Sequence, residues 1–313
     1  HEMYSRGFAY FDDILPNMGF IDQKTGKAQG QATSYQVMEN QYWRILFLDS
    51  GYTTYAPFFH NDTNPLLPPV VDWLANVVKL ADPTDKRGII IMLHHDFFSA
   101  FSKHGYEEIP RQLQKLLGNR VVLTLWGHEH KTSIYAPSNL AGVNTYARCI
   151  GTGGFPVDHI ASPPTGRDAN LQMYDNRIFD ELEGGPFNTP NKHKDGDAYQ
   201  IPVGYNGYFT MTFTGPEVVI DYYTIQWANA ANRELDWKQG HRTMTESFTY
   251  DPRTGDVTQQ YIKAIDPEIT VVTHVNKDME TVRTNSKTLH VKQAAKLSKD
   301  KLTAKEAFQK RVA

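Results

Sequence analysis

The chain has 313 residues, of which 32 are Lys or Arg and 35 are Asp or Glu, so its formal net charge is -3. This length suffices for one large domain or two smaller ones with a buried core, and a hydrophobic content of 40% excludes disorder throughout the chain. The near-neutral charge balance argues against a dedicated nucleic-acid binder. The single cysteine, Cys149, excludes an internal disulfide and a multi-cysteine zinc site, and it favours a reducing compartment such as the cytoplasm.

The chain opens with His1-Glu2-Met3 rather than with Met. We therefore expect further residues upstream, and no targeting signal can be read at this end. The longest apolar run lies at residues 89–93 and is far shorter than the ~20 residues needed to cross a bilayer. The sequence predicts no membrane span.

Strand and helix signals alternate over the first half of the chain. The β-rich runs 35–39 and 42–48 flank a short polar turn and predict a hairpin. Segment 70–78 follows two prolines and carries apolar residues at helical spacing, which predicts an amphipathic helix. The apolar, β-branched run 88–93 is typical of a strand buried on both faces. A second helix is predicted over 109–117, where a glycine follows as its C-cap.

Histidines follow two of the predicted strands. His94 and His95 come after the first, and a Gly-His-Glu-His motif with His128 and His130 follows a second predicted strand at 121–126. Carboxyl ends of parallel strands share the sheet edge where α/β proteins bind ligands. His128 and His130 are two apart in an extended segment, so both imidazoles can face one metal ion. Adjacent His94 and His95 point to opposite sides, so one is expected to be a ligand and the other structural or ligand-orienting.

The second half of the chain is dominated by short β runs. These lie at 145–150, 208–214 and 218–223, and the last two predict a hairpin. Segment 156–205 is rich in Pro, Gly, Asn and Asp and is too long for an ordinary connector, so we expect a surface insertion. The lysine-rich segment 287–313 predicts a solvated basic helix.

The motifs, taken in order, resemble the later part of the calcineurin-like metallophosphoesterase family. The matching elements are His1-Glu2, His94-His95, the Gly-His-Glu-His motif and a Gly-Thr-Gly-Gly segment at 151–154. The resemblance is specific over residues 1–155, weaker to 225 and absent beyond. It implies an α/β fold: a metallophosphoesterase-type β-sandwich flanked by helices, incomplete at the N-terminus and with a C-terminal extension. The predicted domains are 1–225 as the C-terminal part of a calcineurin-like metallophosphoesterase domain with 156–205 inserted, 226–286 as a β-rich extension, and 287–313 as a basic helical tail.

The same resemblance implies roles for individual residues. His94, His128 and His130 would be ligands of a binuclear centre of divalent ions, with Zn, Mn, Fe and Ni as candidates. A metal-bridging hydroxide would then hydrolyse a phosphomonoester or phosphodiester substrate. His1 would protonate the leaving group as the catalytic acid, and Glu2 would orient it.

The family's Asp-x-His motif, its bridging aspartate and the asparagine before His1 do not occur in this sequence. Imidazoles alone do not offset the repulsion between two close dications. This chain alone is therefore expected to hold half of the site and to be inactive without a missing N-terminal segment. One alternative is a truncated or degenerate fold that serves as a non-catalytic scaffold, a binding module or a gene fragment. Another is a single-metal hydrolase in which His94, His128 and His130 form a three-histidine zinc site.

Overall fold

The computed structural model describes most of the chain between residues 33 and 272. Two compact units are distinguished, 1–272 and 273–313, and the second lies outside the described residues together with the tail predicted over 287–313. His1 and Glu2 also lie outside them. None of the helices in the described part has the length and apolar character needed to cross a membrane. Apart from a few single positions, the described ranges are 33–51, 65–102, 105–139, 141–154, 170–183, 200–229, 234–236 and 240–272.

The main sheet has eight strands in the order β1-β2-β3-β4-β6-β5-β7-β16. Strands β2, β3, β4 and β6 are mutually parallel, so their carboxyl ends meet at one edge, and the other pairings are antiparallel. The strands are β1 Gln36–Glu39, β2 Trp43–Phe47, β3 Gly88–Met92, β4 Val122–Trp126, β5 Thr132–Tyr135, β6 Thr145–Ile150, β7 Leu171–Tyr174 and β16 Thr270–Val271.

The predicted hairpin, the predicted buried strand at 88–93 and the predicted strand at 121–126 are confirmed. β1 and β2 pair antiparallel, and the side-chain oxygen of Asn40 accepts hydrogen bonds from the backbone N–H groups of Tyr42 and Trp43, each at 2.8 Å. This short Asx-type turn explains why a polar dipeptide can reverse the chain there. β3 and β4 are buried along nearly their whole length and pair in parallel.

Both predicted helices are present. α2 spans Pro68–Asp72 and continues as a π-helical segment, η4, over Trp73–Val77, a wider winding that the sequence did not predict. α3 spans Glu108–Leu117 and ends at Gly118, whose φ of 59° is left-handed and suits glycine.

A second, antiparallel sheet follows, with the order β10-β11-β14-β15. The predicted hairpin corresponds to β10 (Gly207–Thr214) and β11 (Glu217–Thr224), which turn at Gly215 with φ 60°. Segment 226–286, predicted as an extension, supplies β14 (His241–Tyr250) and β15 (Val257–Ala264) to this same sheet. Segment 156–205, predicted as a surface insertion, includes β7 of the main sheet. Two small pairs complete the strands: β8 Asp180–Glu183 with β9 Gln200–Val203, and β12 Trp227–Asn229 with β13 Glu234–Leu235.

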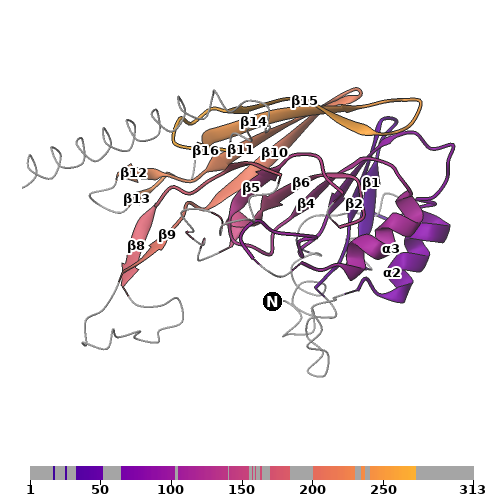
Figure 1. Cartoon of the computed structure of the whole chain (residues 1–313), viewed down its shortest axis with the longest axis horizontal. Coiled ribbons are helices and arrows are strands. Elements are labelled where there is room, and N and C mark those ends of the chain that lie inside the picture. Colours follow the sequence, from indigo (N-terminus) through magenta and orange to yellow (C-terminus); the bar gives the residue numbers. More distant parts are fainter. Residues whose placement is uncertain are drawn as a thin grey trace, which may run out of the picture. The chain divides into compact units, whose positions relative to one another are not determined.

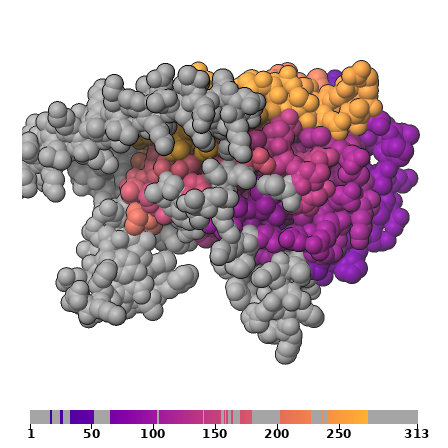
Figure 2. Space-filling view, in the orientation of Figure 1, coloured from indigo at the N-terminus to yellow at the C-terminus, as the bar shows by residue number. Residues whose placement is uncertain are grey.

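The main sheet is covered on both faces, as its continuous apolar strands require. Ile89 and Ile91 pack in one core with Leu113 of α3, whereas Ile90 packs in another core with Ile220 and Phe248 of the second sheet. The alternation of side chains along β3 therefore separates two cores, and the layers are helices, main sheet and second sheet (Figure 1). Figure 2 shows the orange residues of the second sheet lying directly against the magenta residues of the main sheet. The architecture is a mixed α/β sandwich with few helices.

One ion pair connects the two sheets through the core. Arg148 of β6 donates to both carboxylate oxygens of Glu246 on β14, at 2.7 and 2.6 Å, and both side chains are fully buried. Tyr222 and Gln259 also donate to that carboxylate, at 2.6 and 2.7 Å. The desolvation of the buried carboxylate is thus offset by four charge-assisted hydrogen bonds.

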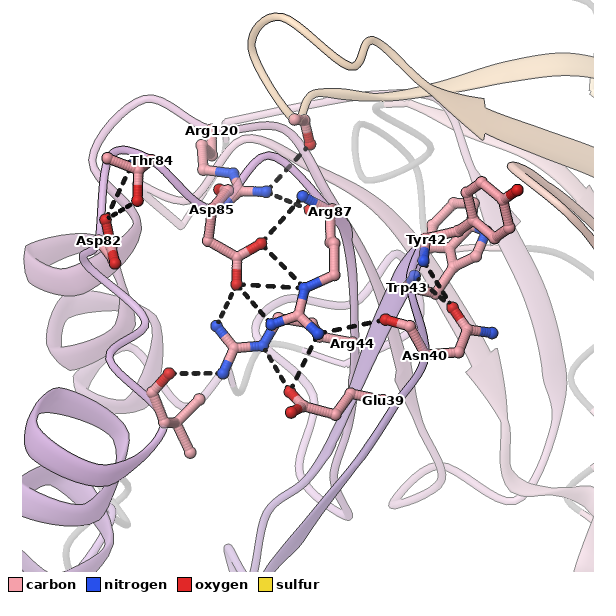
Figure 3. A network of polar contacts seen from close by, with 12 residues as sticks. Glu39, Asn40, Tyr42, Trp43, Arg44, Asp82, Thr84, Asp85, Arg87 and Arg120 are labelled. Atoms are coloured by element: carbon pink, nitrogen blue, oxygen red, sulfur yellow. Dashed lines mark hydrogen bonds and ion pairs between the residues drawn. The ribbon is translucent and has the colours of Figure 1, made fainter.

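A second polar network lies at the amino ends of the parallel strands (Figure 3). Arg44 pairs with Glu39 and Asp85 at 3.2 and 3.0 Å and donates to the carbonyl of Val78. Arg87 pairs with Asp85 at 2.7 Å. We refer to Glu39, Arg44, Asp85, Arg87 and Arg120, which donates to the main-chain oxygens of Asp85 and Arg87, as the arginine cluster.

Candidate metal centre

The two histidine turns are joined through the main chain. The carbonyl of His94, just beyond β3, accepts hydrogen bonds from the N–H groups of Gly127 and His128, at 3.1 and 2.8 Å. This bonding extends the parallel pairing of β3 with β4 past the last paired residues. The predicted juxtaposition of the two motifs at one sheet edge is therefore observed, because the strand register itself places them there.

Three imidazoles gather at this edge: His94, His95 and His128, which we call the histidine group. Their potential ligand atoms all lie within 4.8 Å of one another. Nε2 of His94 and Nδ1 of His128 face each other at 3.1 Å. Two nitrogens bound to one tetrahedral zinc ion at ~2.0–2.1 Å would be roughly 3.3 Å apart, so this pair has nearly the spacing that one ion requires.

His130 and His95 differ from the expected arrangement. His95, expected to have a supporting role, is the buried member of the histidine group, whereas His94 and His128 are exposed. His130, expected as a ligand, is not a member of the group, although it is near enough to influence the charge state of His94 and His128. The ligand roles of His94, His128 and His130 stay predictions.

The histidine group is held in the neutral state. Burial, together with a smaller contribution from the neighbouring His128, lowers the pKa of His94 to about 4. Burial likewise lowers the pKa of His95 to about 3, with His94 and His128 contributing, and lowers the pKa of His128. The more deeply buried ring thus has the lower pKa, in keeping with desolvation as the main cause. Near pH 7 all three rings are uncharged, which is the form of imidazole that binds a metal ion.

Carboxyl groups are close by but do not join the histidine group. Asp96 is buried, and burial raises its pKa to about 7, with repulsion from Glu129 adding to the shift. Oε1 of Glu129 accepts a hydrogen bond of 2.5 Å from the hydroxyl of Ser99. This hydrogen bond connects the loop after β3 with the loop after β4, so in the described structure Glu129 links these two loops.

The turn that carries His128 packs closely against the main chain at Gly151. Gly151 begins a short 3-10 turn, η5 (Gly151–Gly153), and a Cβ at Gly151 would collide with the main-chain oxygens of Gly127 and Glu129. The thiol of Cys149 is buried and donates to the carbonyl of Glu129 at 3.3 Å. The glycine at position 151 is therefore required by close backbone approach.

Two residues at the site were not assigned a role from the sequence. The phenol oxygen of Tyr106 lies 3.2 Å from Nε2 of His128, and its ring lies 4.3 Å from that of His95, centroid to centroid. Ser50, just after β2, contacts the two histidines after β3. The position of Ser50 could have been inferred, because β2 and β3 are both strands that end at this edge. Tyr106 lies in an irregular loop before α3, and no sequence pattern indicates it.

The residues present fit one divalent transition-metal ion. Three neutral imidazoles are a recognised donor set for zinc, with a further position left for water or substrate. A pair of closely spaced dications needs anionic ligands as well, and among the described residues the histidine group contains none.

No protein family and no curated protein matches the chain. Among solved structures, the chain is similar to one titled "Structure of PhoD", with a TM-score of 0.46 and 14% identity, covering 86% of this chain and 51% of that one. It is also similar to GAP50, the anchor in the inner membrane complex of Plasmodium, with a TM-score of 0.32 and 7% identity, covering 79% of this chain and 57% of that one. The chain thus spans about half the length of these two structures.

Proposed function

We propose that the chain carries the histidine part of a metal-dependent hydrolase that acts on phosphomonoesters or phosphodiesters. The observation that carries this proposal is the histidine group: three neutral imidazoles, supplied by two parallel strand ends, that lie within 4.8 Å of one another. Desolvation of a histidine costs free energy, and three together cost more, so a ligand that uses their lone pairs accounts for the arrangement.

His94 and His128 would hold the ion through the facing nitrogens, with His95 or His130 as a third donor. When bound, a divalent ion supplies Lewis acidity toward a phosphoryl oxygen and activates water. The protein's own contribution is to keep the imidazoles neutral and aligned, through burial and through the main-chain bonds at His94. Tyr106 lies at the same edge and offers a hydroxyl within reach of His128.

The finer parts of the proposal follow from the motif resemblance. A binuclear centre of Zn, Mn, Fe or Ni would require carboxylate ligands from outside the described residues. His1 would protonate the leaving oxygen, and Glu2 would orient His1. Both residues lie outside the described part of the chain.

A second candidate function is a hydrolase with one metal ion. The composition of the histidine group, three imidazoles and no carboxylate, favours it over the binuclear form for the described residues. The metal stoichiometry of the chain separates the two: one tightly bound ion per chain supports the single-metal hydrolase, and two support the binuclear centre.

The test uses the full chain and its His128→Ala variant, with His241→Ala as the matched control, because His241 lies on β14 and pairs with Asp266. Zinc and manganese affinities are measured by equilibrium dialysis, and hydrolysis is measured with an aryl phosphate and a bis-aryl phosphate. We expect His128→Ala to lose at least a hundredfold in metal affinity and His241→Ala to keep it. Equal binding by both variants would refute the site. Hydrolysis of either ester by this chain alone would support the single-metal hydrolase, because the half-site and the non-catalytic binding module both predict metal binding without hydrolysis.

A further inference from the structure

Ser50 makes contacts that the proposed function does not use. It lies two residues beyond the last buried leucine after β2, is 1% exposed, and is separated by 44 and 45 residues from the histidines that it contacts. Its hydroxyl oxygen accepts hydrogen bonds from the backbone N–H groups of His94 and His95, each at 3.1 Å. The same oxygen lies 3.0 Å from Nδ1 of the His95 ring.

These contacts use the whole hydrogen-bonding capacity of one hydroxyl. A serine oxygen has two acceptor positions and one donor, so it is fully occupied by two N–H groups and one ring nitrogen. Removal of the hydroxyl would take away the acceptor that both N–H groups use.

The contacts also fix the orientation of both histidines. The peptide unit between His94 and His95 is held on one side by Ser50, which accepts from the His95 N–H, and on the other by Gly127 and His128, which donate to the His94 carbonyl. The ends of three neighbouring strands, β2, β3 and β4, therefore converge on one peptide unit. Because Nδ1 of His95 contacts Ser50, only Nε2 of this ring is left to point toward the centre of the histidine group.

We propose that Ser50 is the positioning residue of the histidine group. It sets the backbone of His94 and the ring of His95, and through them the geometry offered to a divalent ion. The proposal rests on the proposed function only for the metal; the orienting role itself is a property of the metal-free protein. Groups that hydrogen-bond to a metal-binding histidine commonly change metal affinity by about 10–100-fold when removed.

The experiment compares Ser50→Ala and Ser50→Thr with the parent chain, and Ser247→Ala serves as the control because Ser247 is fully buried in the second sheet. Cobalt(II) is the probe, since the intensity and position of its visible bands report the number and geometry of nitrogen ligands. We expect Ser50→Ala to bind cobalt about 10–100-fold more weakly and with an altered spectrum. Ser50→Thr keeps the hydroxyl and should restore both, and Ser247→Ala should match the parent. An unchanged affinity and spectrum in folded Ser50→Ala would overturn the proposal.

Two further measurements cover the cases in which Ser50→Ala does not fold or the parent chain binds no cobalt. If Ser50→Ala does not fold, Ser50→Cys replaces it, because the thiol keeps the volume and makes weaker hydrogen bonds. If the parent chain binds no cobalt, the proposed function fails, but selective ¹⁵N-histidine labelling still tests Ser50 without metal. Amide and ring signals of His94 and His95 that shift in Ser50→Ala and return in Ser50→Thr support the positioning role. Signals that stay unchanged would refute it.

Discussion

The two ends of the parallel strands in the main sheet carry opposite kinds of polar chemistry. At the amino end, the arginine cluster joins Arg44 and Arg87 to two carboxylates by ion pairs of 2.7 to 3.4 Å, and Arg120 donates to main-chain oxygens of the same cluster (Figure 3). At the carboxyl end, the histidine group brings together three like side chains whose pKa values are all lowered. One end satisfies its charges internally, and the other keeps its groups neutral and close together.

This difference shows which end of the main sheet stabilises the fold and which end is suited to bind a metal ion. Complementary charges at the amino end lower the free energy of the folded state by themselves, with no ligand required. Clustered imidazoles at the carboxyl end lose hydration without gaining an opposite charge, which makes them a cost in the absence of a ligand. A substitution at the amino end should therefore change stability and leave metal binding intact, and a substitution at the carboxyl end should do the reverse.

The largest effect in this comparison is expected from Arg44→Met. Arg44 is 4% exposed, and its replacement removes two ion pairs and the hydrogen bond to Val78. Asp85 keeps its ion pair with Arg87, so the loss comes mainly from the missing Arg44 contacts and from the buried carbonyl of Val78, which no longer accepts from Arg44. We expect a loss of about 2 kcal/mol in the free energy of unfolding, measured with urea, and unchanged cobalt affinity.

A matched control is Arg111→Met on α3. The side chain of Arg111 is 61% exposed and pairs with Glu107 and Glu108 on the helix surface. Pairs of this kind contribute at most a few tenths of a kcal/mol, so the control should unfold at nearly the parent urea concentration. A loss of cobalt affinity in Arg44→Met without a loss of stability would contradict the division between the two ends.

A smaller effect is expected from the acid titration of Asp85. Hydrogen bonding to Arg87 lowers the pKa of this carboxyl to about 2, below its ordinary value, so the native state favours the charged form. The resulting stabilisation is complete above about pH 4 and is lost as the pH falls toward 2. Asp85→Asn lacks this contribution at every pH. Its deficit relative to the parent, about 1 kcal/mol after screening by solvent, should shrink between pH 4 and 2 in urea unfolding. A deficit that stays constant over this range would exclude a titrating Asp85.

The sequence predicted more of the histidine group than of the arginine cluster. His94 and His128 follow continuous apolar runs, and the rule that parallel strand ends share an edge is enough to bring them together. The arginine cluster joins residues that are far apart along the chain, such as Glu39 at the end of β1 and Asp85 in the irregular segment before β3, so local patterns do not indicate it.

The parts that the sequence did not predict depend on long-range packing. Glu246 lies in a strand where alternation alone would make it an ordinary polar residue, and only its position opposite Arg148 explains why it is fully buried. The place of His95 in the histidine group similarly depends on Ser50, which belongs to a different strand end. Both cases require knowledge of which strands are neighbours and in which register.

The smallest effect is expected from Tyr106→Phe at the carboxyl end. The phenol hydroxyl lies 3.2 Å from Nε2 of His128, a long contact between neutral groups, and the phenyl ring would keep the packing against His95. One neutral hydrogen bond of this kind is worth about 1 kcal/mol, so cobalt affinity should fall about fivefold with little change in stability.

The size of the Tyr106→Phe effect also tests the extent of the histidine group. A fivefold loss with an unchanged cobalt spectrum agrees with a hydroxyl that only orients His128, since the set of atoms around the ion stays the same. A hundredfold loss accompanied by a new spectrum would mean that the phenol oxygen itself belongs to the set of metal-binding atoms. The carboxyl end would then contain an oxygen donor in addition to imidazoles. It would still differ from the arginine cluster, because its side chains carry no opposite charges that pair with one another.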